Sequence, residues 1–207
     1  MLCIYISTAQ SNMISNSSFE TYSVCPNNAG QFENNVQNWY NPNISSPEYF
    51  NACCTTGCIG TNVPNAGMGF QNAKSGNAFV GMLAFQQPDG REYIGTQLIS
   101  PMIFGHKYYC EMYLSLGDIM RYAISRIGFH FSNSQITQND YYVINVVPQV
   151  ENPLGVFLSS QTNWMKVSGS FIASGGEQWL TIGNFYNDLN TDTLFVTNTN
   201  HIYAYYY

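Results

Sequence analysis

Charged side chains are scarce in this chain. Asp, Glu, Lys and Arg make up only 9% of its 207 residues, whereas an ordinary soluble domain carries roughly 25%. The net charge is −6. The basic residues are scattered, at Lys74, Arg91, Lys107, Arg121, Arg126 and Lys166. Because proteins that bind nucleic acids cluster Lys and Arg against the phosphates, the sequence predicts no nucleic-acid partner.

Long apolar runs are also missing. After the N-terminus no stretch approaches the roughly 20 apolar residues that a membrane-spanning helix needs, so we expect no membrane span. Residues 1–11 instead predict the remnant of a signal peptide, because a short apolar run is followed by small residues near Ala9 and Gln10. The alternative is a first β-strand, since the basic start of a signal peptide is absent. The first interpretation places the protein outside the cell or on its surface.

Recognisable catalytic motifs are absent from the sequence. It contains no Gly-x-Ser-x-Gly turn, no His-Glu-x-x-His helix and no phosphate loop. Its three histidines are dispersed, at His106, His130 and His201. Glu111 and Asp118 come nearest to the two carboxylates of a glycoside hydrolase, but Asp118 follows Gly117 in a predicted turn. We therefore expect that the protein is not an enzyme.

Aromatic and uncharged polar residues replace the missing charges. Aromatics reach 15% and include 16 Tyr, a composition commoner in exported β proteins and carbohydrate-contacting domains. Apolar and polar residues alternate along many stretches that Gly, Pro, Asn and Asp separate, which predicts an all-β sandwich. The predicted strands cover residues 13–20, 78–85, 92–99, 107–116, 123–132, 141–146, 164–171, 178–186 and 202–207.

The six cysteines divide into three groups. Cys3 lies in the predicted signal remnant, and Cys110 alternates with apolar residues as a buried free thiol would. The other four lie in loops rich in Gly, Pro and Asn, at Cys25, Cys53, Cys54 and Cys58. We expect Cys25 to pair with Cys53 or Cys54, and Cys58 with the one left over, since disulfides fasten long loops in exported chains. A zinc site is the alternative, but the spacing is unusual and no histidine is nearby.

The region 26–72 predicts a long loop, cross-linked by these cysteines, that could rim a binding site. The strands themselves offer a candidate binding face. Opposite the apolar rows lie Tyr93, Gln97, Tyr109, Glu111, Tyr113, Arg126 and His130. Aromatic rings beside amide and charged groups suit a sugar, whose C–H faces stack on rings while its hydroxyls need donors and acceptors. The alternative is that half of these residues cover a second packed layer, with Glu111 and Arg126 simply paired.

Several motifs resemble known families. Asn-x-Ser-Phe-Glu at residues 16–20 and Ser-Gly-Asn-Ala-Phe-Val-Gly at 75–81 resemble galactose-binding-like jelly rolls, the fold of many carbohydrate-binding modules. Further stretches resemble exported surface proteins of gliding bacteria that use type IX secretion, at residues 47–53, 91–94, 98–101, 168–171 and 175–185. The resemblance implies a jelly roll, export and association with the cell surface, but it names no ligand.

The resemblance also carries expectations about the domain and a metal. It implies one domain over residues 12–207 that stops short of its last strand, because the family continues past Tyr207 into an acidic strand. It further implies a structural Ca²⁺, held by Glu20, by the carbonyl of Lys74 or Ser75, and by an acid of that last strand. Oxygen ligands of this kind suit a hard cation. The alternative for Glu20 is an exposed acid at a strand end.

Together these observations predict a non-catalytic, exported or cell-surface binding domain. The expected partner is a carbohydrate or another cell-surface polymer, with an adhesive role. The alternative is a structural spacer that contacts protein, since Tyr is favoured at protein interfaces. A glycoside hydrolase comes last among the hypotheses, because Glu111 and Asp118 give it little support.

Overall fold

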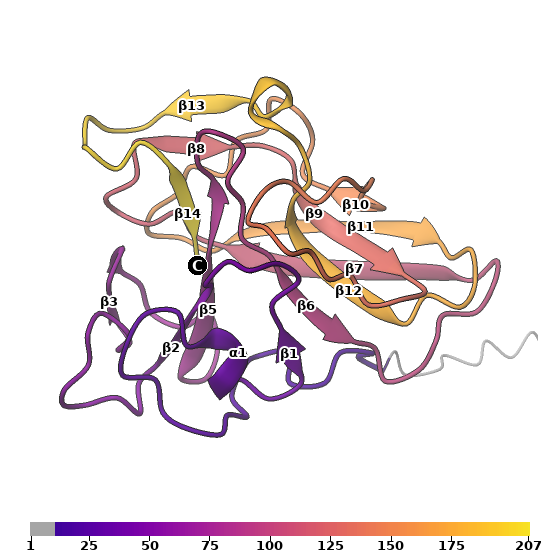
Figure 1. The fold of residues 1–207 in the computed structure, drawn as a ribbon, viewed down its shortest axis with the longest axis horizontal. Coiled ribbons are helices and arrows are strands. Elements are labelled where there is room, and N and C mark those ends of the chain that lie inside the picture. The colour runs from indigo at the N-terminus through magenta and orange to yellow at the C-terminus, as the bar shows by residue number, and fades with distance from the viewer. Residues whose placement is uncertain (1–10) are drawn as a thin grey trace, which may run out of the picture.

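The structure is a computed structural model that describes residues 11–207. The predicted signal remnant therefore lies outside the described residues, except for Ser11. The described chain is nearly all β, as the alternation predicts, and its strands form several sheets consistent with a sandwich (Figure 1). The strand order specific to a jelly roll stays a prediction.

The largest sheet has five antiparallel strands. Their order is β1 (Trp39–Tyr40), β6 (Ile94–Gln97), β12 (Trp179–Asn184), β9 (Ile127–Ser132) and β10 (Val150–Glu151). On its inner face Ile94 and Ile182 stand opposite each other in the β6–β12 register, and both are buried. This face supplies one wall of the hydrophobic core.

Two smaller sheets supply the other wall of the core. One has the order β14 (Ala204–Tyr206), β5 (Ala78–Phe85) and β2 (Glu48–Asn51), and the other pairs β7 (Lys107–Leu114) with β11 (Met165–Ile172). Phe79 and Met82 of β5, together with Leu114 of β7, belong to the same buried cluster as Ile94 and Ile182. One continuous core therefore joins the three sheets.

The remaining elements are short. They are α1 (Phe32–Asn35), β3 (Asn65–Ala66), β4 (Gly69–Phe70), β8 (Tyr122–Ile124), η1 (Asp188–Asn190) and β13 (Thr193–Phe195). β3 pairs with β4, and β13 pairs with β8. Several of these elements lie in the region 26–72, so the predicted long loop is interrupted by α1 and by strands β1 to β4.

Most predicted strands form, with altered ends. β5 has the predicted bounds, and β6, β7, β11, β12 and β14 lie within the predicted ranges or differ from them by one residue. The predicted strand 123–132 is split into β8 and β9, because Arg126 adopts a left-handed backbone with φ of 65°. A non-glycine residue in that region breaks the extended run.

Two predicted strands are wrong. In the range 13–20 only Ile14 makes a bridge, to Leu98, because Asn16 turns the chain with φ of 53°. Its amide side chain bonds both the N–H and the C=O of Thr21, at 2.8 Å each, which gives the backbone an alternative to a strand. In the range 141–146 only Tyr142 forms a bridge, to Gly90.

The predicted disulfides are present. Cys25 bonds to Cys53 and Cys54 bonds to Cys58, so no thiolate of this set is left for zinc. Cys110 has no disulfide partner among residues 11–207 and is half-buried, and burial raises the pKa of its thiol to about 11. Two disulfides favour an oxidising, extracellular setting.

Removing the Cys25–Cys53 bond by a double Cys→Ser change should lower the free energy of unfolding by about 3.5 kcal/mol, because the bond closes a long loop in the unfolded chain. The bond spans 28 residues, whereas Cys54–Cys58 spans only 4. The matched Cys54/Cys58 double variant should therefore lose about 2 kcal/mol. Urea unfolding of both variants checks the order, and an equal loss in the two would contradict it.

Candidate binding surfaces

Three of the seven predicted binding residues lie together on β7. Tyr109, Glu111 and Tyr113 occupy alternate positions and point to the outer side of the sheet, while Leu114 turns inward into the core. On the paired strand β11, Lys166 stands opposite Tyr113. We call this surface the Tyr109 face and define it by Tyr109, Glu111, Tyr113 and Lys166.

The side chains of the Tyr109 face contact one another. The Tyr109 hydroxyl donates a hydrogen bond to Glu111 Oε2 at 2.8 Å, and Lys166 Nζ lies 3.3 Å from that hydroxyl and 3.5 Å from Oε2. The hydrogen bond to Tyr109, followed by the charges of Tyr109 and Glu111, raises the pKa of Lys166. Lys74 Nζ lies 4.4 Å from the centre of the Tyr113 ring. The result is an exposed patch of rings, one acid and two cations.

The ion pair on this face contributes little to folding. The side chains of Lys166 and Glu111 are 47% and 42% exposed, and exposed pairs are screened by water. Their polar atoms remain accessible to a ligand for the same reason. Tyr109 is 45% exposed, which leaves ring surface available for stacking.

Two other predicted residues, Tyr93 and His130, lie under a covering loop. Tyr93 is fully buried, and its hydroxyl donates to the carbonyl of Asn184 at 2.7 Å and accepts from the N–H of Ile144 at 3.0 Å. Burial raises the pKa of Tyr93 well above its usual range. His130 is half-buried, with Nδ1 lying 2.8 Å from the carbonyl of Val147. Neither residue shares a surface with the Tyr109 face.

Arg126 also lies apart from the Tyr109 face. Its guanidinium stacks 3.6 Å from the centre of the Tyr186 ring, and its Nε lies 3.7 Å from Glu151 Oε1. The alternative in which Arg126 pairs with Glu111 therefore does not hold, since each has another partner.

Gln97 belongs to a second surface that sequence reasoning missed. It lines a hollow of about 360 Å³ together with Asn38, Tyr40, Gln135 and Trp179, which we call the Trp179 hollow. The Tyr40 and Trp179 rings meet edge to face, with centres 5.8 Å apart. The volume is within the range of small-ligand pockets, and rings beside three amides are suited to a polar ligand. Sequence reasoning missed this surface because only the register of the folded sheet places Trp179 opposite Gln97.

The predicted calcium ligands Glu20 and Ser75 come from segments that meet. Glu20 Oε1 accepts hydrogen bonds from the N–H groups of Asn77 and Ala78, at 2.8 and 3.0 Å, so its carboxylate lies against the turn that contains Ser75. No group of three or more His, Cys, Asp or Glu that could hold a metal occurs within residues 11–207. Because Ca²⁺ takes 6 to 8 oxygens, carbonyls and water would have to supply most of its ligands here.

Glu111 and Asp118 have separate structural roles. Asp118 lies in a turn, and its Oδ2 accepts a hydrogen bond from the N–H of Phe70 at 2.8 Å. Burial, followed by repulsion from Glu92, raises the pKa of Glu48 to about 8. Neither Glu48 nor Glu92 lines the Trp179 hollow or the cavity of about 1350 Å³ beside β7.

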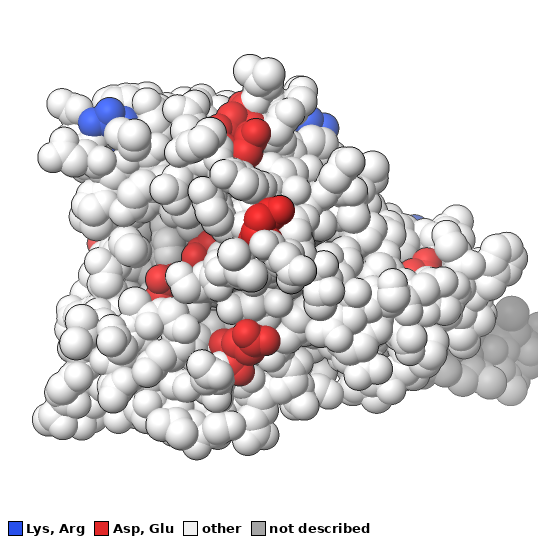
Figure 2. Space-filling model, viewed as in Figure 1, with Lys and Arg blue, Asp and Glu red and all other residues white. Residues whose placement is uncertain are grey.

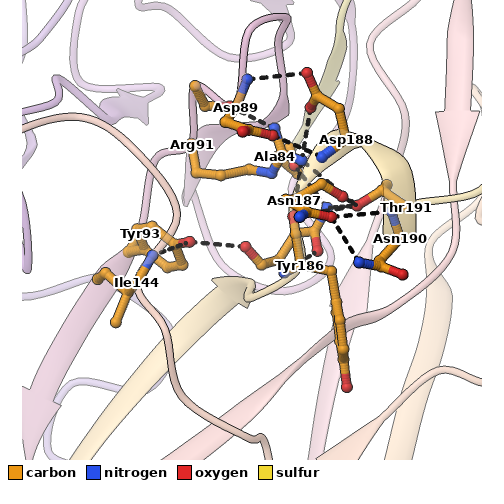
Figure 3. A network of polar contacts seen from close by, with 12 residues as sticks. Ala84, Asp89, Arg91, Tyr93, Ile144, Tyr186, Asn187, Asp188, Asn190 and Thr191 are labelled. Carbon is orange, nitrogen blue, oxygen red and sulfur yellow. Dashed lines mark hydrogen bonds and ion pairs between the residues drawn. The ribbon is translucent and has the colours of Figure 1, made fainter.

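A buried arginine forms a polar network between two loops (Figure 3). The side chain of Arg91 is 0% exposed and lies 3.0 Å from Asp188 Oδ1. Its guanidinium also donates to the carbonyls of Gly90 and Tyr186, at 2.8 Å each. Figure 3 shows these groups turned toward one another between the loops that follow β5 and β12. The network fastens two loops through the two terminal nitrogens of the guanidinium, while Nε is buried without a hydrogen-bond partner.

The chain matches no protein-family model, and a search of curated proteins also found no match. Among the residues that the structure describes, no helix is long and apolar enough to cross a membrane.

Proposed function

We propose that this protein is an exported, non-catalytic domain that binds a carbohydrate through the Tyr109 face. The observation that carries the proposal is the row of Tyr109, Glu111 and Tyr113 on β7, in which Tyr109 and Glu111 are exposed and Tyr113 is half-buried. Lys166 and Lys74 lie within reach of the same rings. A sugar offers C–H faces that stack on tyrosine rings and hydroxyls that accept from ammonium groups and donate to a carboxylate.

The scarcity of charge elsewhere supports a neutral ligand. Figure 2 shows a face that is mostly uncharged, with isolated acidic groups and few basic ones. Strong attraction to a polyanion would need clustered basic residues. A neutral glycan or cell-surface polymer is the partner that this composition favours.

The proposal is tested by glycan-array screening followed by calorimetry. Tyr109→Ala and Tyr113→Ala should each weaken glycan binding about 10-fold, because each removes one stacking ring. Tyr141→Ala is a matched control, since Tyr141 is 48% exposed but lies on another surface. Unchanged binding in both β7 variants would remove the Tyr109 face from the proposal, and a loss only in Trp179→Ala would assign binding to the Trp179 hollow.

Export and calcium belong to the same proposal. The two disulfides support an extracellular location. Structural Ca²⁺ at Glu20 and the Ser75 carbonyl remains a proposal, supported by the meeting of their two segments.

The alternative function is a structural spacer that contacts another protein. Exposed apolar side chains in the loop between β6 and β7 favour it, since Ile103 is 57% and Phe104 79% exposed.

A further inference from the structure

Strand β13 has one open edge. Among the strands of residues 11–207 it pairs only with β8, and all three of its residues are exposed. Figure 1 shows β13 at the upper edge of the molecule, whereas β1 and β6 lie at its lower side. Ile14 bridges Leu98, the residue that follows β6. The open edge of β13 is therefore remote from the place where the described chain begins.

The hydrogen bonds to β8 show which backbone groups of β13 face the open edge. In an antiparallel pair the N–H and C=O of one residue point to the same side, and successive residues alternate. On the β8 side the C=O of Asp192 accepts a hydrogen bond at 3.4 Å and the N–H of Val196 donates one at 2.8 Å. Leu194, two residues from each, faces β8 in the same way. The N–H and C=O of Thr193 and Phe195 therefore point to the open edge, where they have no backbone partner within the described part of the chain.

The residues of β13 do not block pairing with another strand. Natural edge strands are usually protected by Lys, by Pro or by a bulge. β13 reads Thr-Leu-Phe, and its register with β8 runs without a shift. Its two large side chains are apolar, with Leu194 40% and Phe195 60% exposed. An edge with these properties favours association with a further strand.

The edge is complementary to itself. When two copies of β13 run antiparallel with Leu194 at the centre, Thr193 of each copy stands opposite Phe195 of the other. Both residues direct their backbone groups outward, so each such pair exchanges two hydrogen bonds. Leu194 then meets Leu194 of the second copy in a pair without hydrogen bonds, where side chains approach most closely. A register shifted by one residue would set outward groups against groups that already bond to β8.

The charges at the two ends of β13 fit the same register. Arg121 stands beside Val196, since its C=O accepts the hydrogen bond from the Val196 N–H. In the antiparallel arrangement Asp192 of the second copy lies opposite Val196, and its backbone is two strand spacings, about 10 Å, from that of Arg121. Residues directly opposite one another share a face of the sheet, so the two charged side chains point to the same side. Arg121 donates to the carbonyl of Thr199 but makes no ion pair among residues 11–207.

We propose that β13 is a dimerisation edge at which two copies of this chain pair antiparallel about Leu194. The pairing joins the β8–β13 sheets of both copies into one sheet in the order β8, β13, β13, β8. A second copy is the occupant because the outward backbone groups and the two charges both match when the edge meets itself. β13 has only three residues, so the interface is small and the dimer forms at high protein concentration.

Hydrogen exchange at different protein concentrations tests the edge directly. Raising the concentration about 100-fold should slow exchange of the Thr193 and Phe195 amides about 10-fold, because the dimer fraction follows mass action. The Leu194 amide is the internal control. It faces β8 in the monomer and in the dimer, so its exchange should change much less. Exchange of Thr193 and Phe195 that does not depend on concentration would overturn the proposal.

Disulfide trapping tests the register. Leu194→Cys places two thiols directly opposite each other in the dimer, at a separation that a disulfide can bridge. Under mild oxidation this variant should form covalent dimers about 10-fold faster than Phe195→Cys, whose counterpart in the second copy is Thr193. The parent chain, which retains the free Cys110, gives the background. Equal trapping of the two variants would contradict pairing about Leu194.

Charge reversal tests the contact between Arg121 and Asp192. Asp192→Arg should raise the dissociation constant about 5-fold, because the new cation faces Arg121 of the other copy. Adding Arg121→Asp should restore dimerisation, which a merely structural role of either residue would not do. Sedimentation equilibrium measures association, and urea unfolding at low concentration checks that each variant folds. A parent chain that stays monomeric at millimolar concentration would refute the dimer.

Discussion

Replacing Arg91 by Met should lower the free energy of unfolding by about 3–5 kcal/mol, since breaking a buried ion pair leaves an uncompensated charge. Arg91 is 1% exposed, and its guanidinium meets Asp188 Oδ1, Thr191 Oγ1 and two backbone carbonyls. The pKa of Arg91 is lowered, because the effect of burial exceeds the opposite effect of the hydrogen bond and charge of Asp188. The guanidinium is stable here only because Asp188 and the carbonyls replace its water.

The loss extends beyond one ion pair, because Arg91 holds two loops together. Asp89 and Asp188 exchange hydrogen bonds, each accepting from the other's backbone N–H, at 2.9 and 2.7 Å. Without the guanidinium the carboxylate of Asp188 and the Tyr186 carbonyl keep their burial and lose a donor. Arg91→Lys should also destabilise the domain, since an ammonium cannot reproduce the planar fork.

Arg126→Met is the matched control. Arg126 pairs with Glu151, but its side chain is 22% exposed, so its removal should cost less than about 1 kcal/mol. Urea unfolding followed by tyrosine fluorescence gives both values. A cost for Arg91→Met as small as that for Arg126→Met would contradict the structural role of the network.

Local pattern predicted much of this fold, but not its long-range polar contacts. The alternation in β7 is visible in the sequence because one face packs on the core and the other does not. The importance of Arg91 is not visible, since its partner Asp188 follows 97 residues later. Asn16 broke a predicted strand because its side chain bonds the backbone, an effect that hydrophobic periodicity does not register.

The candidate site was predicted only where its residues share one strand. Tyr109, Glu111 and Tyr113 share one strand, so period two alone places them on one face. The alternation also places Tyr93 on the polar face of its strand, yet its ring packs directly against Gly183. A Cβ added to Gly183 would lie 2.3 Å from the Tyr93 ring. The loop that carries Ile144 closes over that ring together with Phe185. A covering loop contributed from 51 residues away leaves no local signal in the sequence.

The pH dependence of stability should be set largely by two buried carboxyls. Burial first, and then repulsion from Glu92, raise the pKa of Glu48 from 4.5 to about 8, and burial also raises the pKa of Glu92. Glu92 accepts hydrogen bonds from the N–H groups of Leu83 and Ser46, at 2.7 and 3.1 Å. Glu48 accepts one from the Tyr205 hydroxyl at 2.5 Å.

The direction follows from the raised pKa of Glu48. The folded state binds the proton more tightly than the unfolded state, so this contribution to stability is fully present below pH 4.5 and is lost as the pH rises to about 8. At about 1.4 kcal/mol for each pKa unit, the loss over this window should reach up to about 5 kcal/mol. Stability at pH 8 should therefore be well below that at pH 5.

Glu48→Gln should remove most of this loss, because glutamine stays neutral and can still accept the Tyr205 hydrogen bond. The variant should match the parent at pH 5 and exceed it at pH 8 by a few kcal/mol, on the order of the pKa-linked loss. Urea unfolding between pH 5 and 8.5 with intact disulfides measures the profile. Glu33→Gln, which replaces an exposed acid, is the control and should leave the profile unchanged. If Glu48→Gln and the parent lose stability in parallel, proton binding at Glu48 does not govern the pH dependence.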